Sequence, residues 1–175
     1  MKKVLAILFV GTVVAGLALA GPPQAYVAER EAALQALLVE KLGDDAAPIR
    51  VTITATKAIL TGEVSERATQ ELCEEVALYF PGIADVDNQV KALHDDKLGA
   101  DLVKNEAMDA DLEVTVKMKL RAEIGVHAER IEVEAVEGIV SLRGLAPERA
   151  RKTIALETTA KVKGVRKVID LLRVP

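Results

Sequence analysis

The 175-residue chain contains one cysteine, no tryptophan and few aromatic side chains. A single cysteine cannot form an intramolecular disulfide, so the fold must depend on its hydrophobic core. Beyond residue 20, the only aromatic residues are Tyr26, Tyr79 and Phe80. This scarcity argues against a platform on which nucleic-acid bases stack, and against an aromatic shelf for sugars. Cys73 lies in a helical pattern, where we expect a small, partly buried side chain; a redox role is the alternative.

Residue patterns of catalysis and metal binding are also missing. His94 and His127 have no cysteine partner, HExxH spacing or nucleophile elbow near them, and we predict that both are surface residues. Asp44–Asp45 and Asp95–Asp96 lack the alternating oxygen ligands of a calcium loop, so we expect solvated acidic turns. The sequence therefore predicts no catalytic residues, no cofactor and no metal site.

The N-terminal residues have the pattern of a secretory signal peptide. Lys2 and Lys3 precede an uncharged apolar run over residues 4–20 that ends in Ala18-Leu19-Ala20. Small residues at these last positions are typical of a signal-peptidase site, so we predict cleavage after Ala20 and a periplasmic mature protein. No cysteine follows the run, so a lipoprotein signal is not expected. The alternative is an uncleaved N-terminal helix that anchors the chain in the membrane.

The rest of the sequence repeats itself at a constant offset of 82 residues, without gaps. The identical pairs include Leu38 and Leu120, Gly43 and Gly125, Ile49 and Ile131, Val51 and Val133, Leu60 and Leu142, Gly62 and Gly144, Gly82 and Gly164, and Val86 and Val168. A register of this length predicts two copies of one structural unit. We place repeat one at residues 29–93, a linker at 94–108 and repeat two at 109–175.

Each unit is predicted to begin with an amphipathic helix. Leu34, Leu38 and Leu42 recur every four residues in repeat one. The corresponding positions in repeat two are Leu112, Val116, Leu120 and Ile124. Asp109 or Asp111 is the expected N-cap of this second copy.

Two strands, a second helix and a third strand follow. Apolar residues alternate over 49–53 and 58–64, and Glu137–Gly138 predicts a tight hairpin turn between the matching strands of repeat two. The next helix is expected to bury Ala68, Leu72, Val76 and Tyr79 in repeat one, and Ala150, Ile154, Thr158 and Val162 in repeat two. Gly82 and Gly164 are expected to end this helix.

The predicted fold class is α+β, with two tandem helix–strand–strand–helix–strand units. The second and third strands run in the same direction because a helix connects them, so each unit should form a three-stranded mixed sheet with both helices on one face. A unit of about 65 residues is small for an independent core. The two units would gain stability by packing together, although the sequence does not show such a contact.

Charge is distributed unequally between the repeats. Residues 29–93 hold 6 basic and 12 acidic side chains, whereas residues 106–175 hold 13 basic and 12 acidic ones. The segment from Arg143 to Arg173 has a net charge of +6. We predict a basic surface patch formed by Arg149, Arg151, Lys152, Lys161, Lys163, Arg166 and Lys167. Such a patch suits phosphate headgroups; an ordinary solvated face, or a contact with the acidic repeat, is the alternative.

The pattern resembles the BON domain, a bacterial module. The resemblance is closest at Val133–Gly144, which reads VEAVEGIVSLRG, and at Gly164–Val168, which reads GVRKV. Repeat one matches with AILTG at Ala58–Gly62 and GIADV at Gly82–Val86, but has Thr56–Lys57 where the other copy has Gly138–Ile139. Its hairpin therefore lacks the expected glycine. Tandem copies behind a signal peptide are similar to osmotically inducible periplasmic proteins of this family.

The resemblance implies a protein without enzymatic activity that serves envelope maintenance or the osmotic-stress response. It implies binding to an anionic phospholipid surface, which the charge distribution assigns mainly to repeat two. A protein–protein adaptor and a small-ion or small-ligand binder in the periplasm are the alternatives. The expected partners are an anionic membrane surface or an envelope protein, with repeat–repeat or homo-oligomer contacts. Nucleic acid is not expected, because the chain is acidic overall.

Overall fold

The computed structural model describes residues 24–93 and 100–175, with side chains from residue 105 onward in the second segment. The predicted signal peptide with its cleavage site, His94 and Asp95–Asp96 lie outside these residues. Within the described part of the chain, no helix is both long and apolar enough to cross a membrane.

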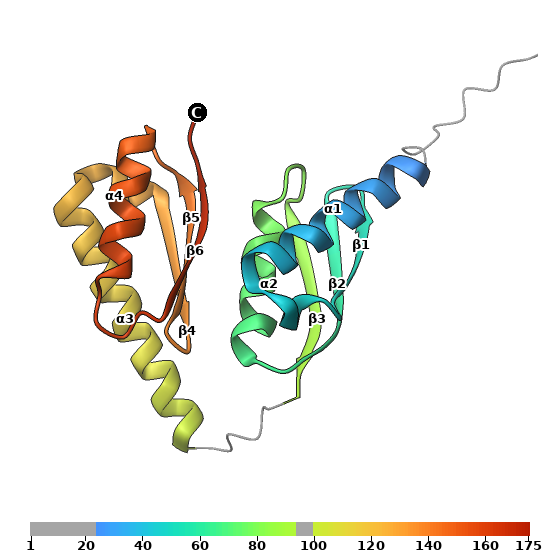
Figure 1. The fold of residues 1–175 in the computed structure, drawn as a ribbon, viewed down its shortest axis with the longest axis horizontal. Coiled ribbons are helices and arrows are strands. Elements are labelled where there is room, and N and C mark those ends of the chain that lie inside the picture. The colour runs from blue at the N-terminus through green and yellow to red at the C-terminus, as the bar shows by residue number, and fades with distance from the viewer. Residues whose placement is uncertain (1–23, 94–99) are drawn as a thin grey trace, which may run out of the picture.

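The elements follow the predicted order in both repeats (Figure 1). Repeat one consists of α1 (Gln24–Leu42), the short 3-10 helix η1 (Asp44–Ala46), β1 (Arg50–Thr54), β2 (Lys57–Val64), α2 (Arg67–Tyr79) and β3 (Asp85–Ala92). Repeat two consists of α3 (Ala100–Ile124), the 3-10 helix η2 (Gly125–Arg130), β4 (Ile131–Val136), β5 (Ile139–Leu145), α4 (Arg149–Ala160) and β6 (Lys167–Arg173).

The first helix of repeat two is longer than predicted. α3 begins at Ala100, inside the segment expected to be a linker, so the prediction of an N-cap at Asp109 or Asp111 is wrong. Asp109 is instead an interior helix residue with 8% exposure. Its carboxylate accepts hydrogen bonds from the backbone N–H groups of Glu137 (3.0 Å) and Gly138 (3.3 Å). The carboxylate therefore accepts hydrogen bonds from the backbone of the β4–β5 hairpin turn and not from the first turn of a helix.

Both sheets have the predicted mixed topology. In each repeat the middle strand pairs antiparallel with the first strand and parallel with the third. The predicted α+β fold class is therefore confirmed. The hairpins share one register, since Thr54 lies opposite Lys57 and Val136 lies opposite Ile139.

The two hairpin turns reach this register with different residues. Glu137 and Gly138 have φ values of 50° and 78°, as a type I′ turn requires. In repeat one Ala55 takes the first position with a φ of 54°, and no glycine follows it. The missing glycine therefore does not change the strand register.

One glycine in the middle strand of each repeat, Gly62 or Gly144, allows that strand to lie close to the loop before the first strand. A Cβ atom at Gly62 would lie 2.7 Å from the carbonyl oxygen of Pro48, and one at Gly144 would lie even closer to that of Arg130. Pro48 and Arg130 are themselves 82 residues apart. Both glycines also have positive φ values, 142° and 134°. The repeated glycine is therefore required by space and by backbone conformation.

Each core lies between the two helices and the inner face of the sheet. Leu34, Leu38, Leu60 and Leu72 are fully buried in repeat one. In α4 the predicted buried face is displaced, because Ile154 is 40% exposed. The residues of this helix that are buried are Ala155 and Thr159, while Ala150 is exposed and Thr158 is half-buried.

The two repeats stack into four alternating layers of helices and sheets. In Figure 1 the order is α3 and α4, then the sheet β4–β5–β6, then α1 and α2, then the sheet β1–β2–β3. α2 therefore has a sheet on either side, whereas α4 is in an outer layer. This difference explains why Leu72 of α2 is fully buried while Ile154, its equivalent in α4, is exposed.

The contact between the repeats is apolar on the side of repeat two. Val136, Ile139, Ile169 and Leu171, on the face of the sheet that turns away from α3 and α4, join the core of repeat one. The equivalent positions in repeat one are Thr54, Lys57, Asp87 and Gln89. The outer face of the first sheet is therefore polar and faces solvent. The polar face ends the stack, as a terminal unit of a repeat array must.

We expect Gly144→Ala to be much more damaging than Gly125→Ala. Both glycines have positive φ, but a Cβ atom at Gly125 would meet no atom within 4 Å. Gly125→Ala should cost about 1 kcal/mol of unfolding free energy, the backbone penalty alone. Gly144→Ala adds a backbone collision and should cost about 3 kcal/mol or more. Thermal unfolding measures both values, and equal losses would contradict the close contact with Arg130.

The contrast between the two sheet faces gives a second prediction. Leu171 is fully buried, so Leu171→Gln should cost about 2–4 kcal/mol by removing apolar packing and burying an amide. The matched control is Gln89→Leu at the equivalent exposed position, which should change stability by less than about 0.5 kcal/mol. Chemical denaturation followed by circular dichroism measures both. A small effect of Leu171→Gln would show that the repeats are not packed through this face.

Candidate interaction site on repeat two

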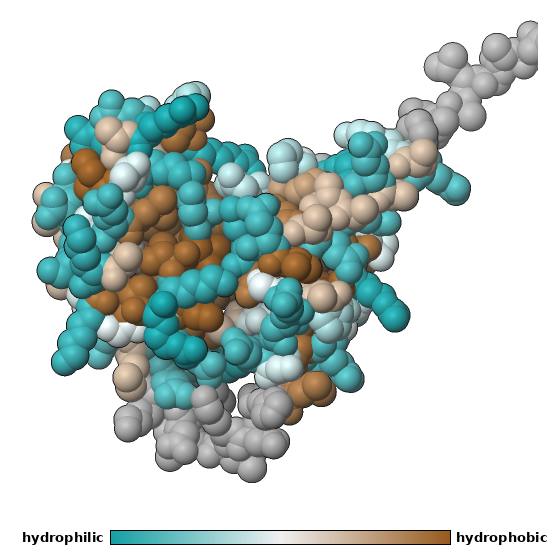
Figure 2. All heavy atoms as spheres, in the orientation of Figure 1, coloured by the Kyte–Doolittle hydropathy of each residue, from teal (hydrophilic) through white to brown (hydrophobic). Residues whose placement is uncertain are grey.

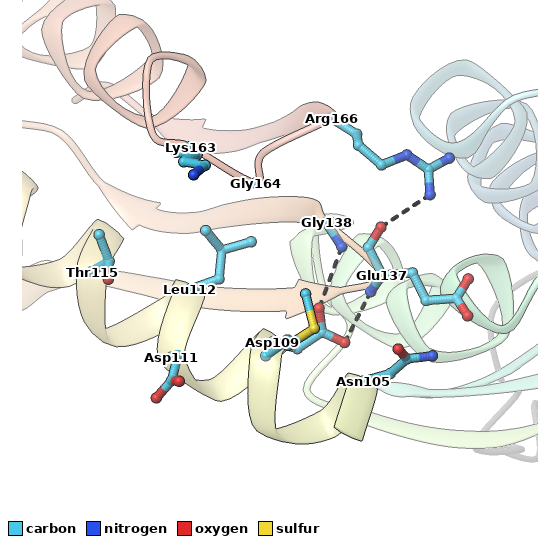
Figure 3. A pocket seen from close by; sticks show the side chains of 11 residues that line it. Asn105, Asp109, Asp111, Leu112, Thr115, Glu137, Gly138, Lys163, Gly164 and Arg166 are labelled. Atoms are coloured by element: carbon cyan, nitrogen blue, oxygen red, sulfur yellow. Dashed lines mark hydrogen bonds between the residues drawn. The ribbon is translucent and has the colours of Figure 1, made fainter. Parts of the chain in front are cut away.

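A cavity of about 540 Å³ lies at one end of repeat two. It is bounded by the N-terminal half of α3, the β4–β5 hairpin turn and the loop between α4 and β6 (Figure 3). Its lining consists of Asn105, Met108, Asp109, Asp111, Leu112, Thr115, Glu137, Gly138, Lys163, Gly164 and Arg166. The lining therefore combines acidic and basic side chains with apolar ones.

The walls of this cavity are held together by hydrogen bonds between three elements. Asp109 binds the hairpin turn to α3, as described above. Arg166 binds the same turn to the α4–β6 loop, because its backbone N–H donates to the Gly138 carbonyl (2.7 Å) and its guanidinium to the Glu137 carbonyl (3.1 Å). A Cβ atom at Gly138 would lie 2.7 Å from the Gly164 carbonyl oxygen. The cavity, which is open to solvent on one side, thus has walls held by a hydrogen-bonded framework.

The seven residues of the predicted basic patch do not form one cluster. Arg149, Arg151 and Lys152 lie at the start of α4, while Lys161, Lys163, Arg166 and Lys167 follow its end. A helix of 12 residues is about 18 Å long. The structure therefore divides the patch into two groups at opposite ends of α4.

Two residues of the first group make intramolecular bonds. Lys152 is 2.8 Å from the carboxylate of Asp170 and donates to the Leu172 carbonyl, which ties α4 to β6. Arg151 donates to the carbonyl of Ile124 at the end of α3 and pairs with Glu148. Both side chains therefore stabilise repeat two and are restricted in what else they contact.

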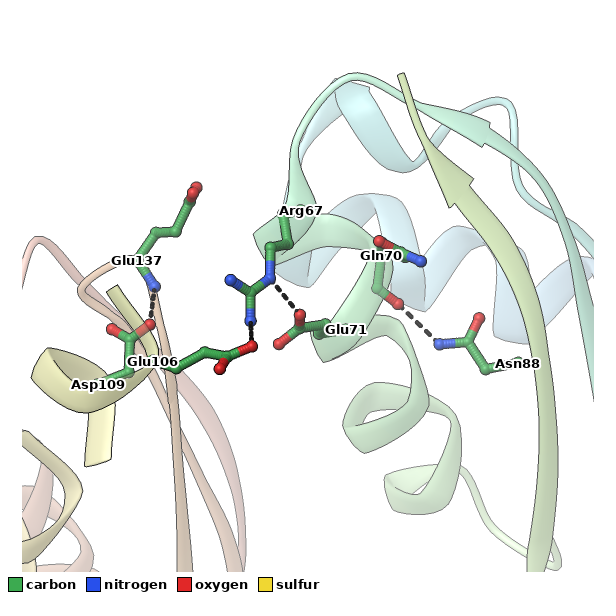
Figure 4. Close-up of polar contacts among 7 residues, drawn as sticks. All are labelled: Arg67, Gln70, Glu71, Asn88, Glu106, Asp109 and Glu137. Carbon is green, nitrogen blue, oxygen red and sulfur yellow. Dashed lines mark hydrogen bonds and ion pairs between the residues drawn. The ribbon is translucent and has the colours of Figure 1, made fainter. Parts of the chain in front are cut away.

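The Lys152–Asp170 pair has a counterpart in repeat one. At the equivalent positions, the Asn88 side chain on β3 donates to the backbone carbonyl of Gln70 on α2 at 2.7 Å (Figure 4). Asn88 and Asp170 also accept a hydrogen bond from the backbone N–H two residues further along the chain. Repeat two thus has an ion pair where repeat one has a neutral hydrogen bond, at equivalent junctions between the second helix and the last strand.

The second group includes a contact between the repeats. The Lys167 ammonium group donates to the carbonyls of Lys41 (3.0 Å) and Leu42 (3.4 Å), the last residues of α1. A cation at a helix C-terminus is favourable because the free carbonyls carry partial negative charge. Lys167 therefore binds repeat one. For this residue the structure shows the contact with the acidic repeat that was the alternative to a membrane contact.

The remaining cations of the patch are open to solvent. Arg149 and Lys163 are exposed, and among the described residues their side chains make no hydrogen bond or ion pair; the Arg149 backbone carbonyl accepts a bond from the Thr153 hydroxyl. Lys161 is exposed and is 4.0 Å from the carboxylate of Glu157. Arg67, the equivalent of Arg149, instead pairs with Glu71 at 2.5 Å and with Glu106 of repeat two at 3.5 Å (Figure 4). A structural role therefore belongs to Arg67 and not to Arg149.

Arg143 is among the basic residues that sequence reasoning left out of the patch and that matter for the assembly. Arg143 on β5 lies 2.7 Å from the carboxylate of Glu75 on α2 and also pairs with Glu132. It joins the basic repeat to the acidic one at the edge of the apolar contact. In the sequence, the unequal charge of the two repeats was the signal for such a contact. Glu75 could be identified as the partner of Arg143 only from the stacking of the repeats.

Exposed apolar side chains accompany the open cations. Large hydrophobic residues with at least 40% exposure are concentrated in repeat two, at Met108, Val114, Met118, Val126, Leu145 and Ile154. Figure 2 shows hydrophobic surface gathered over the half of the molecule that contains repeat two, bordered by hydrophilic residues. Val114, Met118 and Ile154 belong to α3 and α4, the outer helical layer. This layer therefore combines cations with exposed apolar groups.

The acidic turn predicted at Asp44–Asp45 has a structural role. The Asp45 carboxylate accepts hydrogen bonds from the backbone N–H groups of Ser65 (2.8 Å) and Glu66 (3.0 Å), just before α2. Burial alone would raise the pKa of Asp45, but these N–H groups hold it below its ordinary value. Within the described residues, no group of three acidic, histidine or cysteine side chains is placed to hold a metal ion.

Cys73 lies in the core of repeat one. Its side chain is fully buried, and Sγ lies 3.0 Å from the carbonyl oxygen of Gln70. Burial raises the pKa of this thiol to about 12. Only the thiolate is nucleophilic, so the folded protein holds Cys73 in its unreactive form at neutral pH.

We therefore predict that Cys73 reacts with a thiol-specific reagent only after unfolding. At pH 8 a group with a pKa of about 12 is ionised in roughly one molecule in 10⁴, and the side chain is also enclosed. The reaction is followed by absorbance with and without denaturant. A Cys73→Ala, Ala150→Cys variant provides the control, because residue 150 is exposed and should react at once. Rapid reaction of native Cys73 would contradict its burial.

Comparison with known proteins agrees with the duplicated architecture. The model of the BON domain family matches residues 27–93 and 108–175. An uncharacterised protein in the gshII 5′ region of Anaplasma centrale is 25% identical over 125 residues, which are 71% of this chain and 80% of that protein.

Two solved structures share some similarity with the fold. One is CdsD, a structural protein of the type III secretion system of Chlamydia trachomatis, with 11% identity, a TM-score of 0.32 and coverage of 82% of this chain and 92% of that chain. The C-terminal domain of CdsD matches with 12% identity and a TM-score of 0.30, over 79% of this chain and 95% of its own. The family model, by contrast, covers most of the sequence in two consecutive matches, so the chain belongs to the BON domain family.

Proposed function

We propose that this protein is a periplasmic, non-enzymatic envelope protein that binds anionic phospholipid surfaces through the α3–α4 layer of repeat two. Membership of the BON family supports an envelope or stress-related role, because BON domain proteins are generally not enzymes and are often periplasmic. The N-terminal signal pattern supports export, with cleavage after Ala20.

The stacking of the repeats is the observation that carries this proposal. It covers the second sheet with α1 and α2 and leaves the α3–α4 layer as the open face of repeat two. Arg149, Lys161 and Lys163 extend from this layer or its adjoining loop into solvent. The surface available to a membrane therefore belongs to the more basic repeat.

Both parts of a peripheral membrane contact are present on this layer. Each cation near an anionic surface contributes about 1 kcal/mol at physiological salt. Exposed apolar groups such as Met118 and Ile154 add binding energy where they enter the headgroup region. Three open cations give about 3 kcal/mol, which is enough for weak, reversible adsorption that depends on salt.

Repeat one offers a less suitable surface. It holds twice as many acidic as basic residues, and its outer sheet face carries Asp85 and Asp87 beside Lys57. A negative surface is repelled by anionic lipid. The contact is therefore expected on one end of the stack only.

The test is co-sedimentation of the mature chain, residues 21–175, with vesicles of phosphatidylglycerol and phosphatidylcholine. We expect binding that increases with phosphatidylglycerol content and weakens as the salt concentration rises from 0.1 M to 1 M, because the Debye length falls from ~10 Å to ~3 Å. Replacing Arg149, Lys161 and Lys163 with glutamate should weaken binding by about 100-fold or more. Arg151, Lys152 and Lys167 are left intact because they stabilise the fold.

The matched control is the replacement of Arg50, Lys57 and Lys91 with glutamate. These residues lie on the outer face of the first sheet, and the charge change is the same. Equal loss of binding in both triple variants would show that net charge alone is responsible. Equal binding to neutral vesicles, or binding that does not change with salt, would exclude the proposed mechanism, and no binding to any vesicle would favour a protein adaptor.

A further inference from the structure

The offset of 82 residues places Arg30 and Leu112 at the same point of α1 and α3. In repeat one the Arg30 side chain bridges the hairpin turn and the loop before β3. Its guanidinium donates to the carbonyls of Ala55 (3.4 Å) and Pro81 (3.0 Å). It also lies 6.0 Å from the centre of the Tyr26 ring and 5.8 Å from that of Phe80. A half-buried arginine of the same chain therefore occupies this end of repeat one.

The same place in repeat two is the cavity described above. Leu112 stands in place of Arg30, and Met108 and Val162 stand in place of the two aromatic residues. A Cβ atom at Gly82 would be 3.1 Å from the Arg30 guanidinium, and one at Gly164 would be 3.7 Å from Leu112. The backbone framework is thus shared, while the side chain that fills it is missing from repeat two.

In repeat two, the carbonyls equivalent to the two acceptors of Arg30 do not share a single donor. Arg166 replaces Ala84 of repeat one, and its guanidinium donates to the Glu137 carbonyl, the counterpart of the Ala55 carbonyl. Figure 3 shows this side chain directed along the turn and away from Leu112. The Lys163 carbonyl, the counterpart of the Pro81 carbonyl, accepts no hydrogen bond within the described residues. One of the two guanidinium acceptors is therefore open.

The cavity lining has a small excess of acidic residues. It contains three acidic and two basic residues. Asp109 is engaged by the hairpin turn, whereas Asp111 is exposed on the wall formed by α3. Met108 and Leu112 supply apolar surface on the same helix. A flat cation with several donors matches this combination of acceptors and apolar walls better than a compact ammonium group does.

We propose that this cavity binds the guanidinium group of an arginine side chain presented by another polypeptide. The arginine enters between α3 and the α4–β6 loop and occupies the position that Arg30 occupies in repeat one. The Lys163 carbonyl accepts a hydrogen bond from the guanidinium, the charge of Asp111 at the rim attracts it, and Met108 and Leu112 contact its aliphatic stem. Repeat two thereby binds an arginine of another polypeptide in the way that repeat one binds its own Arg30.

Amide NMR spectra of the mature chain, recorded without lipid, test this proposal. The probe is N-acetyl-arginine N-methylamide, which imitates an arginine within a chain. We expect saturable shifts at Gly138 and Gly164 with a Kd on the order of 1 mM. The corresponding citrulline amide has nearly the same shape but no charge, and it should bind at least about 10-fold more weakly. Equal affinity for the two probes would overturn the proposal.

Free L-arginine distinguishes a protein ligand from a small metabolite. If the cavity serves arginine within a polypeptide, the free amino acid should bind no more tightly than the capped amide. Substantially tighter binding of the free amino acid would overturn the assignment to a polypeptide partner. Because no vesicles are present, the result is independent of lipid binding.

Variants locate the site. Leu112→Arg places the side chain of repeat one in repeat two, and it should reduce binding of the probe by at least about 10-fold by occupying the cavity. Ala122→Arg is the matched control, because it adds the same charge at an exposed position of α3 and should leave binding unchanged. Asp111→Asn preserves the exposed shape and should weaken binding about 3-fold or more. Unchanged binding in Asp111→Asn and in folded Leu112→Arg would place the guanidinium elsewhere.

Discussion

The burial of one sheet face determines how this molecule is assembled. Val136, Ile139, Ile169 and Leu171 form an apolar surface on the side of the second sheet that its own helices do not cover. Apolar surface of this kind is removed from water only if another element packs on it. The helices of repeat one supply that cover, so the two small units become one four-layered body with a shared core. Each unit alone would be marginal in size.

The stacking also decides which charges remain available. Arg143 and Lys167 face repeat one and are engaged by Glu75 and by the end of α1. Lys152 and Arg151 hold α4 to its neighbours. The exposed cations of the predicted patch that remain are Arg149, Lys161 and Lys163, on the opposite side of repeat two. The excess of basic residues thus serves two purposes, cohesion between the repeats and an open surface.

Comparison of equivalent positions shows how duplication allows the copies to diverge. The glycine pair at 62 and 144 is constant because backbone atoms leave no space for a side chain. By contrast, repeat one has Asn88 and Gln70 where repeat two has Asp170 and Lys152, at a junction that tolerates either bond. Leu112 occupies the position of Arg30, and Arg166 makes a hydrogen bond equivalent to one of those that Arg30 makes. The two repeats share the same backbone constraints, whereas their side-chain interactions differ.

The sequence by itself determined the unit, its topology and its duplication, because these depend on local periodicity and on glycines that recur at one offset. It did not determine the start of α3 or the role of Asp109, because a carboxylate that precedes an apolar pattern suits a helix cap and a hairpin turn equally. The buried face of α4 and the division of the basic patch depend on which layer is outermost. The cavity depends on Leu112 where Arg30 stands in the other copy. Only the tertiary structure decided these features, since each arises from contacts between segments far apart in the chain.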